Sequence, residues 1–321
     1  MDQLTSVPSS IAESIEPTLK IYLPLLNKNS TAIKSTLRRT FSYGLNPRNN
    51  LDIYYPVNNP TGAGCPVFIY TYGGGFTRGD RASEDHLLYR NIRHFFAEKC
   101  GFVTVIPDYR LVPEARFPSG GQDIEMVVKW LIDNNDKIGQ PRPLFMMGNS
   151  AGAVHLCTFV MHPSFTELRS KITSNTDTFP LRLNAAVFCS MPTSFRNPRP
   201  YRAPVLAKYY GETIEQDCPL GLLEACNKNK NVSDAAPGVQ FLLMYGSLDP
   251  EDEILECNKE FIALWRSGKV SSGVELEVQI MEGHNHISPP PALGTNISRE
   301  EVWGFNVAGL CNAAAQSRGE V

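Results

Sequence analysis

Residues 148–152 are the segment that most constrains how this chain folds. They read Gly-Asn-Ser-Ala-Gly, a G-x-S-x-G pattern, and lie between the apolar run 144–147 and a helical segment at 153–161. A buried strand that turns sharply into a helix can hold a serine in a strained conformation, with its hydroxyl above the sheet. The two glycines remove Cβ atoms that would clash in such a turn. The segment therefore predicts a nucleophilic Ser150 on a strand–turn–helix unit.

Apolar runs that suit buried strands recur along the chain, and helical segments lie between most of them. Strands that alternate with helices indicate a mostly parallel sheet covered on both faces. The predicted strands are residues 51–55, 67–72, 102–107, 144–147, 185–190, 241–245 and 276–281. The predicted helices include 83–99, 122–134, 251–267 and a final helix that begins near Glu300, after a capping box made by Ser298 and Glu301.

Two stretches depart from this alternation. Residues 9–40 look helical but interrupted, because Pro17 and Pro24 are expected to limit helix length. Residues 192–237 are rich in proline and polar groups, and an insertion there would lie over the carboxyl edge of the sheet, where ligands bind. One apolar face of the first stretch carries Ile11, Ile15 and Leu19. We therefore expect a core of residues 41–191 and 238–321, an N-terminal helical segment 1–40 that contributes to a cap, and a cap insertion at 192–237.

The composition argues against several classes of protein. The 321 residues carry a net charge of −3, which suggests neither a nucleic acid nor an anionic membrane as partner. No run approaches the roughly 20 apolar residues that span a bilayer, and the N-terminus lacks a secretory signal pattern. The eight cysteines include no C-x-x-C pair, so a zinc site is not expected. These features favour a cytoplasmic protein with no metal.

A nucleophilic serine needs a base, and the base needs an acid to orient it. In the fold indicated here these partners follow the serine in the order acid and then histidine, each just past a strand. Asp249 follows the predicted strand 241–245, and both His284 and His286 follow the strand 276–281. We favour His286 as the base because it precedes the apolar Ile287, and His284 remains the alternative.

The tetrahedral intermediate of acyl transfer also needs hydrogen-bond donors for its oxyanion. Residues 70–76 read Tyr-Thr-Tyr-Gly-Gly-Gly-Phe and follow the predicted strand 67–72. Three consecutive glycines let the backbone approach a substrate and direct N–H groups toward it. The candidate donors are the backbone N–H groups of Gly74, Gly75 and Ala151.

Four motifs in order resemble the hormone-sensitive-lipase-like branch of the α/β-hydrolase family. Residues 108–114, Asp-Tyr-Arg-Leu-Val-Pro-Glu, continue to Phe-Pro at 117–118 and closely resemble a signature of that branch. Residues 70–76 resemble its H-G-G-G motif, 148–152 its G-D-S-A-G elbow, and Asp249-Pro250 its D-P acid motif. The Asn-His-Ile-Ser segment that contains His286 is similar to the N-H-F segment of kynurenine formamidase-like relatives.

This resemblance runs from about residue 51 to residue 287. It implies an α/β-hydrolase fold with an eight-stranded sheet, helices on both faces, a helical cap and no cofactor. It also implies esterase or lipase-like activity on a small-molecule ester. A homodimer through the last strand and the terminal helix is compatible with the family.

The chain departs from the family pattern at two positions. Tyr72 stands where the family usually has histidine, and it could support the glycine loop or place its hydroxyl in the pocket as a substrate contact. Asn149 stands where the family usually has aspartate, so the local support of the elbow must differ. Neither change removes the predicted nucleophile, acid or base.

Three functions are consistent with these residues. The leading hypothesis is a serine hydrolase, carboxylesterase-like, that cleaves an ester through an acyl-enzyme. The same residues could serve an acyl transferase or an amide, formamide or lactone hydrolase. A non-catalytic ligand-binding homologue is the third, because fold alone does not establish activity. Phe195, Tyr201, Tyr209 and Tyr210 could line a pocket for an apolar acyl group or pack the cap onto the sheet.

Overall fold

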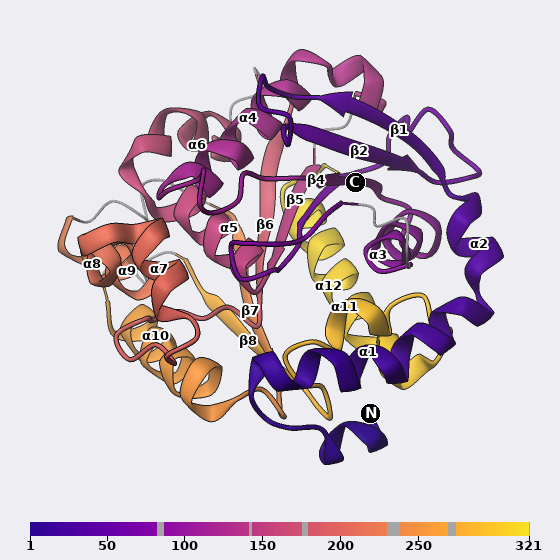
Figure 1. Cartoon of the computed structure of the whole chain (residues 1–321). Coiled ribbons are helices and arrows are strands. Elements are labelled where there is room, and N and C mark those ends of the chain that lie inside the picture. Colours follow the sequence, from indigo (N-terminus) through magenta and orange to yellow (C-terminus); the bar gives the residue numbers. More distant parts are fainter. Residues whose placement is uncertain (82–86, 141–142, 175–178, 230–237, 269–273, 321) are drawn as a thin grey trace.

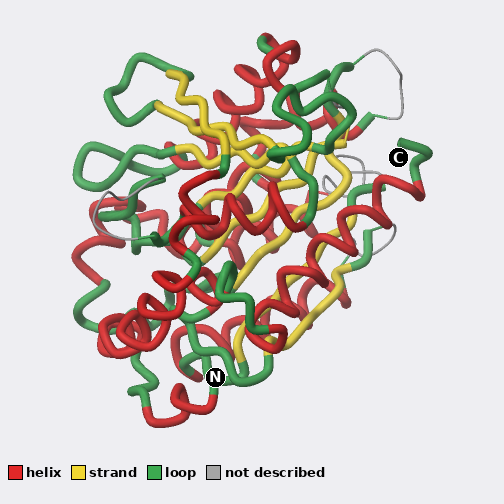
Figure 2. Tube along the Cα trace, turned by 90° about the vertical axis from the view of Figure 1, so that its right-hand side faces the viewer, coloured by secondary structure: helices red, strands yellow, loops and turns green. Residues whose placement is uncertain are grey.

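One twisted, mostly parallel sheet runs through the centre of the molecule (Figures 1 and 2). The computed structural model describes residues 1–81, 87–140, 143–174, 179–229, 238–268 and 274–320. Within these ranges eight strands hydrogen-bond in the order β1-β2-β4-β3-β5-β6-β7-β8. The pairs β1–β2 and β2–β4 are antiparallel, and the pairs from β4 through β8 are parallel. The predicted α/β-hydrolase sheet is confirmed.

Seven of the strands agree with the predicted ones to within a few residues, and the first strand was not predicted. The strands are β1 (Leu37–Ser42), β2 (Asn50–Tyr55), β3 (Val67–Thr71), β4 (Val103–Pro107), β5 (Pro143–Asn149), β6 (Arg182–Cys189), β7 (Gln240–Gly246) and β8 (Leu276–Met281). The prediction that residues 9–40 are helical is therefore wrong for residues 37–40, which belong to β1. β1 lies at an edge of the sheet and is mostly exposed, so its sequence lacks the apolar run of a buried strand.

Helices cover both faces of the sheet, as alternation of strands and helices predicts. Successive residues of β3 point to opposite faces of the sheet. Ile69 joins the core beneath α4 and α5, whereas Phe68 joins the core beneath η2 and α12. Figure 1 shows α5 and α12 on opposite sides of the strands. The main helices are α1 (Ile11–Lys28), α2 (Ser30–Ser35), α3 (Arg90–His94) with the turn η2 (Phe95–Lys99), α4 (Ser119–Asp133), α5 (Ala151–Met161), α6 (Thr166–Thr173), α7 (Ala203–Tyr210), α8 (Ile214–Asp217), α9 (Pro219–Asn229), the turn η6 (Glu251–Leu255) with α10 (Glu256–Ser267), α11 (Pro289–Ala292) and α12 (Ser298–Ser317).

The predicted helix 83–99 is found in part. α3 and η2 cover residues 90–99, residues 87–89 are not helical, and residues 83–86 lie outside the described residues. The predicted helices 122–134 and 251–267 are found with small shifts of their ends.

The prolines of the N-terminal segment do not interrupt its helix. α1 is continuous for 18 residues through both Pro17 and Pro24, so the prediction that they limit helix length is wrong. A proline removes the N–H that would bond the carbonyl four residues earlier. Those carbonyls belong to Glu13 and Lys20, two exposed residues, so water can satisfy them.

The predicted capping box of the last helix is also wrong. α12 begins at Ser298, and no side chain caps it. The Glu301 carboxylate instead accepts hydrogen bonds from the N–H groups of Gly294 and Asn296 and from the Lys99 ammonium. A buried carboxylate with three donors is well satisfied there, which explains why it does not reach back to the helix start.

The carboxyl ends of the parallel strands lead directly into the predicted site segments. β3 precedes the glycine run, β5 precedes Ser150, β7 precedes Asp249 and β8 precedes His286. The helices α7 to α9 lie between β6 and β7, and α9 packs against α5. Among the described helices, none combines the length and apolar character that crossing a membrane requires.

Candidate active site

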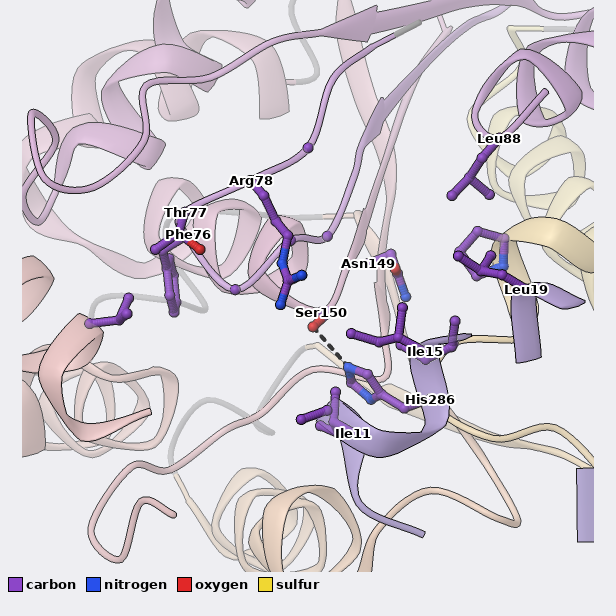
Figure 3. Close-up of a pocket in the computed structure, with 18 of the residues that line it drawn as sticks. Ile11, Ile15, Leu19, Phe76, Thr77, Arg78, Leu88, Asn149, Ser150 and His286 are labelled. Carbon is purple, nitrogen blue, oxygen red and sulfur yellow. Dashed lines mark hydrogen bonds between the residues drawn. The ribbon is translucent and has the colours of Figure 1, made fainter. Parts of the chain in front are cut away.

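Ser150 occupies the sharp turn that its sequence context predicts. Its backbone has φ 52° and ψ −119°, a strained conformation between the end of β5 and the start of α5. A Cβ on Gly148 would lie 2.4 Å from the Gly152 carbonyl oxygen, and a Cβ on Gly152 would lie 2.1 Å from the Thr71 carbonyl oxygen. Both positions therefore require glycine, and the turn holds the Ser150 side chain at the floor of a pocket (Figure 3).

Ser150, His286 and Asp249 form a hydrogen-bonded row. The Ser150 Oγ and the His286 Nε2 are 2.9 Å apart, and the His286 Nδ1 lies 3.2 Å from the Asp249 Oδ1. All three residues are at most 9 % exposed. This row suits a tautomer in which Nδ1–H donates to the carboxylate and Nε2 accepts from the serine hydroxyl, the arrangement that acyl transfer requires.

The Asp249 carboxylate is held in place by two further donors. Its Oδ2 accepts hydrogen bonds from the Ser190 hydroxyl and from the Gly246 N–H, both at 2.8 Å. Ser190 directly follows β6 and has a positive φ of 45°. Sequence reasoning missed this residue, and the signal that could have found it is a serine just past a parallel strand next to the strand of the acid.

His284, the alternative base, lies in different surroundings. Its Nδ1 is 2.9 Å from the Ser288 hydroxyl, and its Nε2 is buried with no hydrogen-bond partner among the described residues. Burial lowers the pKa of His284 to about 4, so its imidazole is neutral near pH 7. The histidine that contacts Ser150 is therefore His286.

The predicted oxyanion donors either line the Ser150 pocket or follow Ser150 in the chain. Gly74 and Gly75 line the pocket with Ser150, and Ala151 begins α5 at its N-terminal end. Gly74 and Gly75 have φ values of 146° and 59°, which favour glycine. Within the described ranges, no protein acceptor takes the N–H groups of Gly74, Gly75 or Ala151. These N–H groups are thus available to an oxyanion.

Tyr72 faces away from the pocket and supports the glycine loop. Its hydroxyl donates to the Asp108 Oδ1 at 2.7 Å and accepts from the Arg48 Nη2 at 2.9 Å. Arg48 also donates to the carbonyls of Tyr109 and Gly79, and so connects the end of the glycine loop to the segment after β4. Of the two roles considered for Tyr72, the geometry favours support of the glycine loop over contact with a substrate.

Asn149 also contributes to the support of the elbow. Its Nδ2 donates to the Cys189 carbonyl at 3.4 Å, and a Cβ on Gly73 would lie 3.1 Å from its Oδ1. The amide therefore packs between the glycine loop and the end of β6. No buried charge lies at this position, as the aspartate-to-asparagine difference predicts.

The pocket above Ser150 has a volume of about 510 Å³. One wall comes from α1, whose Ile11, Ile15 and Leu19 line the pocket together with His286 (Figure 3). Another wall comes from the start of α7 and from Phe76. The pocket is mostly apolar, which is typical of small-molecule sites.

The four aromatic residues proposed for the pocket divide into two groups. Tyr201 lines the pocket. Phe195, Tyr209 and Tyr210 are buried in the core, where Tyr209 stacks on Phe76 with ring centroids 4.7 Å apart. These three therefore pack the inserted helices onto the sheet and support the pocket wall from behind.

Across the described residues, no cluster of three or more His, Cys, Asp or Glu side chains has the arrangement of a metal site. All eight cysteines are free thiols.

Comparisons with known proteins agree with this architecture. Esterase LipC of Mycobacterium tuberculosis is 30% identical over 119 residues, which are 37% of this chain and 28% of that protein. Esterase LipI of the same organism is 31% identical over 101 residues, 31% of this chain and 30% of that protein. The chain thus matches less than a third of the length of these relatives. The crystal structure of an inhibited esterase B from Lactobacillus rhamnosis superimposes with a TM-score of 0.63 at 14% identity and covers 94% of this chain and 98% of that one.

The strand order and the serine elbow define an α/β-hydrolase fold, which is also the fold of the esterase structure that superimposes on this chain. A model of the BD-FAE family matches residues 51–217, which contain the glycine loop and the elbow. The chain belongs to the BD-FAE family.

Proposed function

We propose that this protein is a carboxylesterase-like serine hydrolase that cleaves a carboxylic ester of a small, mostly apolar substrate. The observation that carries the proposal is the row of Ser150, His286 and Asp249, with a hydrogen bond of 2.9 Å between the nucleophile and the base. The esterase names of LipC and LipI support the same reaction class.

Each residue has a definite part in the proposed reaction. Ser150 Oγ attacks the ester carbonyl while His286 Nε2 accepts its proton. The N–H groups of Gly74, Gly75 and Ala151 stabilise the oxyanion, and collapse of the intermediate expels the alcohol with a proton from His286. Water then attacks the acyl-enzyme with His286 as base, which releases the acid and restores Ser150. Asp249 keeps the imidazole in the productive tautomer throughout.

The shape of the pocket supports a small substrate. A volume of about 510 Å³ bounded by α1 and by the start of α7 suits a small molecule rather than a polymer chain. Because α1 and residues 201–206 form pocket walls, we infer a cap made of the N-terminal segment and the insertion 192–237, of which residues 230–237 lie outside the described residues. Kinship with the hormone-sensitive-lipase-like branch rests on the motif resemblance, as does that with kynurenine formamidase-like relatives.

A cytoplasmic location and a homodimer also belong to this proposal. Ile280 of β8 and Val302 and Phe305 of α12 are 45–51 % exposed, which supports contact between two copies along this edge. Light scattering on the purified protein tests the dimer, with Val302→Lys expected to yield monomers. A wild type that is monomeric at micromolar concentration would contradict it.

The proposed activity is tested with a panel of p-nitrophenyl esters, a lactone, an anilide and a formamide. We expect ester hydrolysis by the wild type and a loss of at least a thousandfold in kcat for Ser150→Ala and His286→Ala. His284→Ala is the matched control and should retain most of the activity. Faster turnover of the anilide or formamide than of every ester would contradict the assignment. Transfer of the acyl group to an added alcohol, with no free acid formed, would also contradict it.

A further inference from the structure

Arg78 places a positive charge in the pocket that holds the Ser150 nucleophile. It lies four residues after Gly74, on the loop that follows β3, and it lines the same pocket as Ser150. Figure 3 shows its side chain extending from this loop toward the Ser150 hydroxyl. The loop is anchored because the N–H groups of Thr77 and Arg78 both donate to the Gly74 carbonyl. The guanidinium is thus carried by the same turn that presents the oxyanion donors.

The Arg78 guanidinium has no protein partner in the described part of the chain. The other arginine of the pocket, Arg202, is different, because its Nε donates to the Glu253 Oε1 at 2.6 Å. Asp80 lines the pocket as well and is engaged in an interaction of its own. Arg78 therefore retains its full capacity to bind an anion from the pocket.

The surroundings of Arg78 narrow the chemistry of that anion. The wall from α1 presents Ile11, Ile15 and Leu19, and the opposite wall presents Phe76 and Val205. A ligand that fills this pocket needs apolar parts along both walls and a negative group between them. A guanidinium recognises a carboxylate through paired N–H donors, which an aliphatic wall cannot do.

We propose that Arg78 forms an anion subsite that makes the enzyme select esters carrying a carboxylate near the scissile bond. This inference rests on the proposed esterase function and names its substrate class. Arg78 acts here as a specificity-determining residue that binds substrate, and the chemical step stays with Ser150 and His286.

Two pairs of esters test the proposal, each differing by one carboxylate. On the acyl side the pair is the p-nitrophenyl monoester of glutaric acid and p-nitrophenyl valerate. On the alcohol side the pair is p-carboxyphenyl acetate and p-tolyl acetate. The readout is the ratio of kcat/KM for the charged ester to kcat/KM for the neutral one, so that changes in general activity or folding cancel.

We expect this ratio to fall about tenfold in Arg78→Gln for at least one pair, the effect of losing one hydrogen bond between charged groups. Arg78→Lys should retain an intermediate ratio. Arg266→Gln is the matched control, since Arg266 is an exposed arginine on α10 outside the pocket, and its ratio should equal that of the wild type. A rise in salt should lower the wild-type ratio. A ratio that is unchanged in Arg78→Gln for both pairs would overturn the subsite.

A binding measurement separates this inference from the proposed function. Calorimetry with Ser150→Ala, which cannot turn over the ester, measures binding of the glutarate monoester directly. Tighter binding to Ser150→Ala than to Ser150→Ala/Arg78→Gln supports the anion subsite even if the wild type hydrolyses none of the esters. Equal binding to both variants, or equal absence of binding, would refute the subsite even if neutral esters are hydrolysed.

Discussion

The Ser190 hydroxyl donates a 2.8 Å hydrogen bond to the Asp249 Oδ2, joining the ends of the neighbouring strands β6 and β7. The other oxygen of this carboxylate faces His286. Because Oδ2 accepts from Ser190 and from the Gly246 N–H while Oδ1 faces His286, the Ser190 bond helps to fix the rotation of the carboxylate. The orientation of the imidazole depends on it in turn.

Ser190→Ala should lower kcat about tenfold with little change in KM. Loss of a hydrogen bond to a charged group is worth about 1.5 kcal/mol, which corresponds to roughly that factor in rate. Steady-state kinetics on a p-nitrophenyl ester measure the effect. The matched control is Ser194→Ala, whose hydroxyl accepts only a 3.4 Å bond from the Arg196 N–H among the described residues. Equal kinetics for the two variants would argue against this role of Ser190.

Tyr72→Phe should weaken both the fold and the reaction. The change removes the donor to Asp108 and the acceptor for Arg48, and leaving buried polar groups unsatisfied costs about 1–3 kcal/mol. Because Tyr72 immediately precedes the glycine loop, we expect kcat to fall several-fold as well. The control is Tyr55→Phe, which loses a hydroxyl bond to the Lys137 carbonyl far along the sheet. Urea unfolding and kinetics together should show loss of stability in both variants but loss of kcat only in the first.

Glu253 connects the two walls of the pocket. Its carboxylate accepts from the Tyr201 hydroxyl at 2.7 Å, from Arg202 at 2.6 Å and from the Ile11 N–H at 3.5 Å. Glu253→Gln should loosen α1 and the start of α7 and raise KM about threefold, the effect expected of roughly 0.5–1 kcal/mol. The neighbouring Asp252 pairs with Arg199 at an exposed site, so Asp252→Asn should leave KM unchanged. Identical KM values for both variants and the wild type would show that Glu253 does not shape the pocket.

Stability should decrease as the pH falls below neutrality because of buried histidines. Burial lowers the pKa of His155 to about 3 and that of His284 to about 4, whereas histidine in an unfolded chain titrates near 6.5. The unfolded chain therefore binds protons that the folded chain excludes. The stability that depends on each neutral histidine is complete above about pH 7 and is lost as the pH falls from 6.5 toward the folded-state pKa, about 4 for His284 and about 3 for His155.

His155→Gln isolates one of these groups. Between pH 7.5 and pH 5, His155 should account for about 2 kcal/mol of the decrease in unfolding free energy. The variant is expected to be less stable at pH 7.5, since His155 packs against Phe76 and Tyr109, but to lose less on acidification. Urea titrations at both pH values measure this difference. A variant that loses as much stability as the wild type would contradict the assignment.

Much of the site could be predicted because each proposed catalytic residue follows a strand by no more than five residues. Ser150, Asp249 and His286 come after β5, β7 and β8, and parallel strands bring their carboxyl ends to one edge of the sheet. Chain order alone then places acid and base beside the nucleophile. The choice of His286 over His284 rested on a single neighbouring residue, and the hydrogen bond to Ser150 supplies the geometric evidence for it.

Other features depend on contacts between segments that are distant in sequence. Ser190 can bond Asp249 only because β6 and β7 are neighbours in the sheet. Glu253 can connect two pocket walls only because the start of α1 and the residues just before α7 lie next to it. β1 escaped prediction because an exposed edge strand such as Leu37–Ser42 has no apolar pattern. The assignment of Glu301 to a capping box is wrong because its carboxylate instead accepts from the Gly294 N–H and from Lys99, which are distant contacts that the sequence does not show.

The most direct test of the central claim is to label the folded wild type with a fluorophosphonate and to map the adduct by mass spectrometry. The proposed function predicts one adduct on Ser150, at a rate that falls at least a hundredfold in His286→Ala and strongly in Asp249→Asn. His284→Ala should label at nearly the wild-type rate. A folded wild type that gives no adduct, or an adduct on Ser150 whose rate is the same in His286→Ala, would contradict a serine hydrolase built on these three residues.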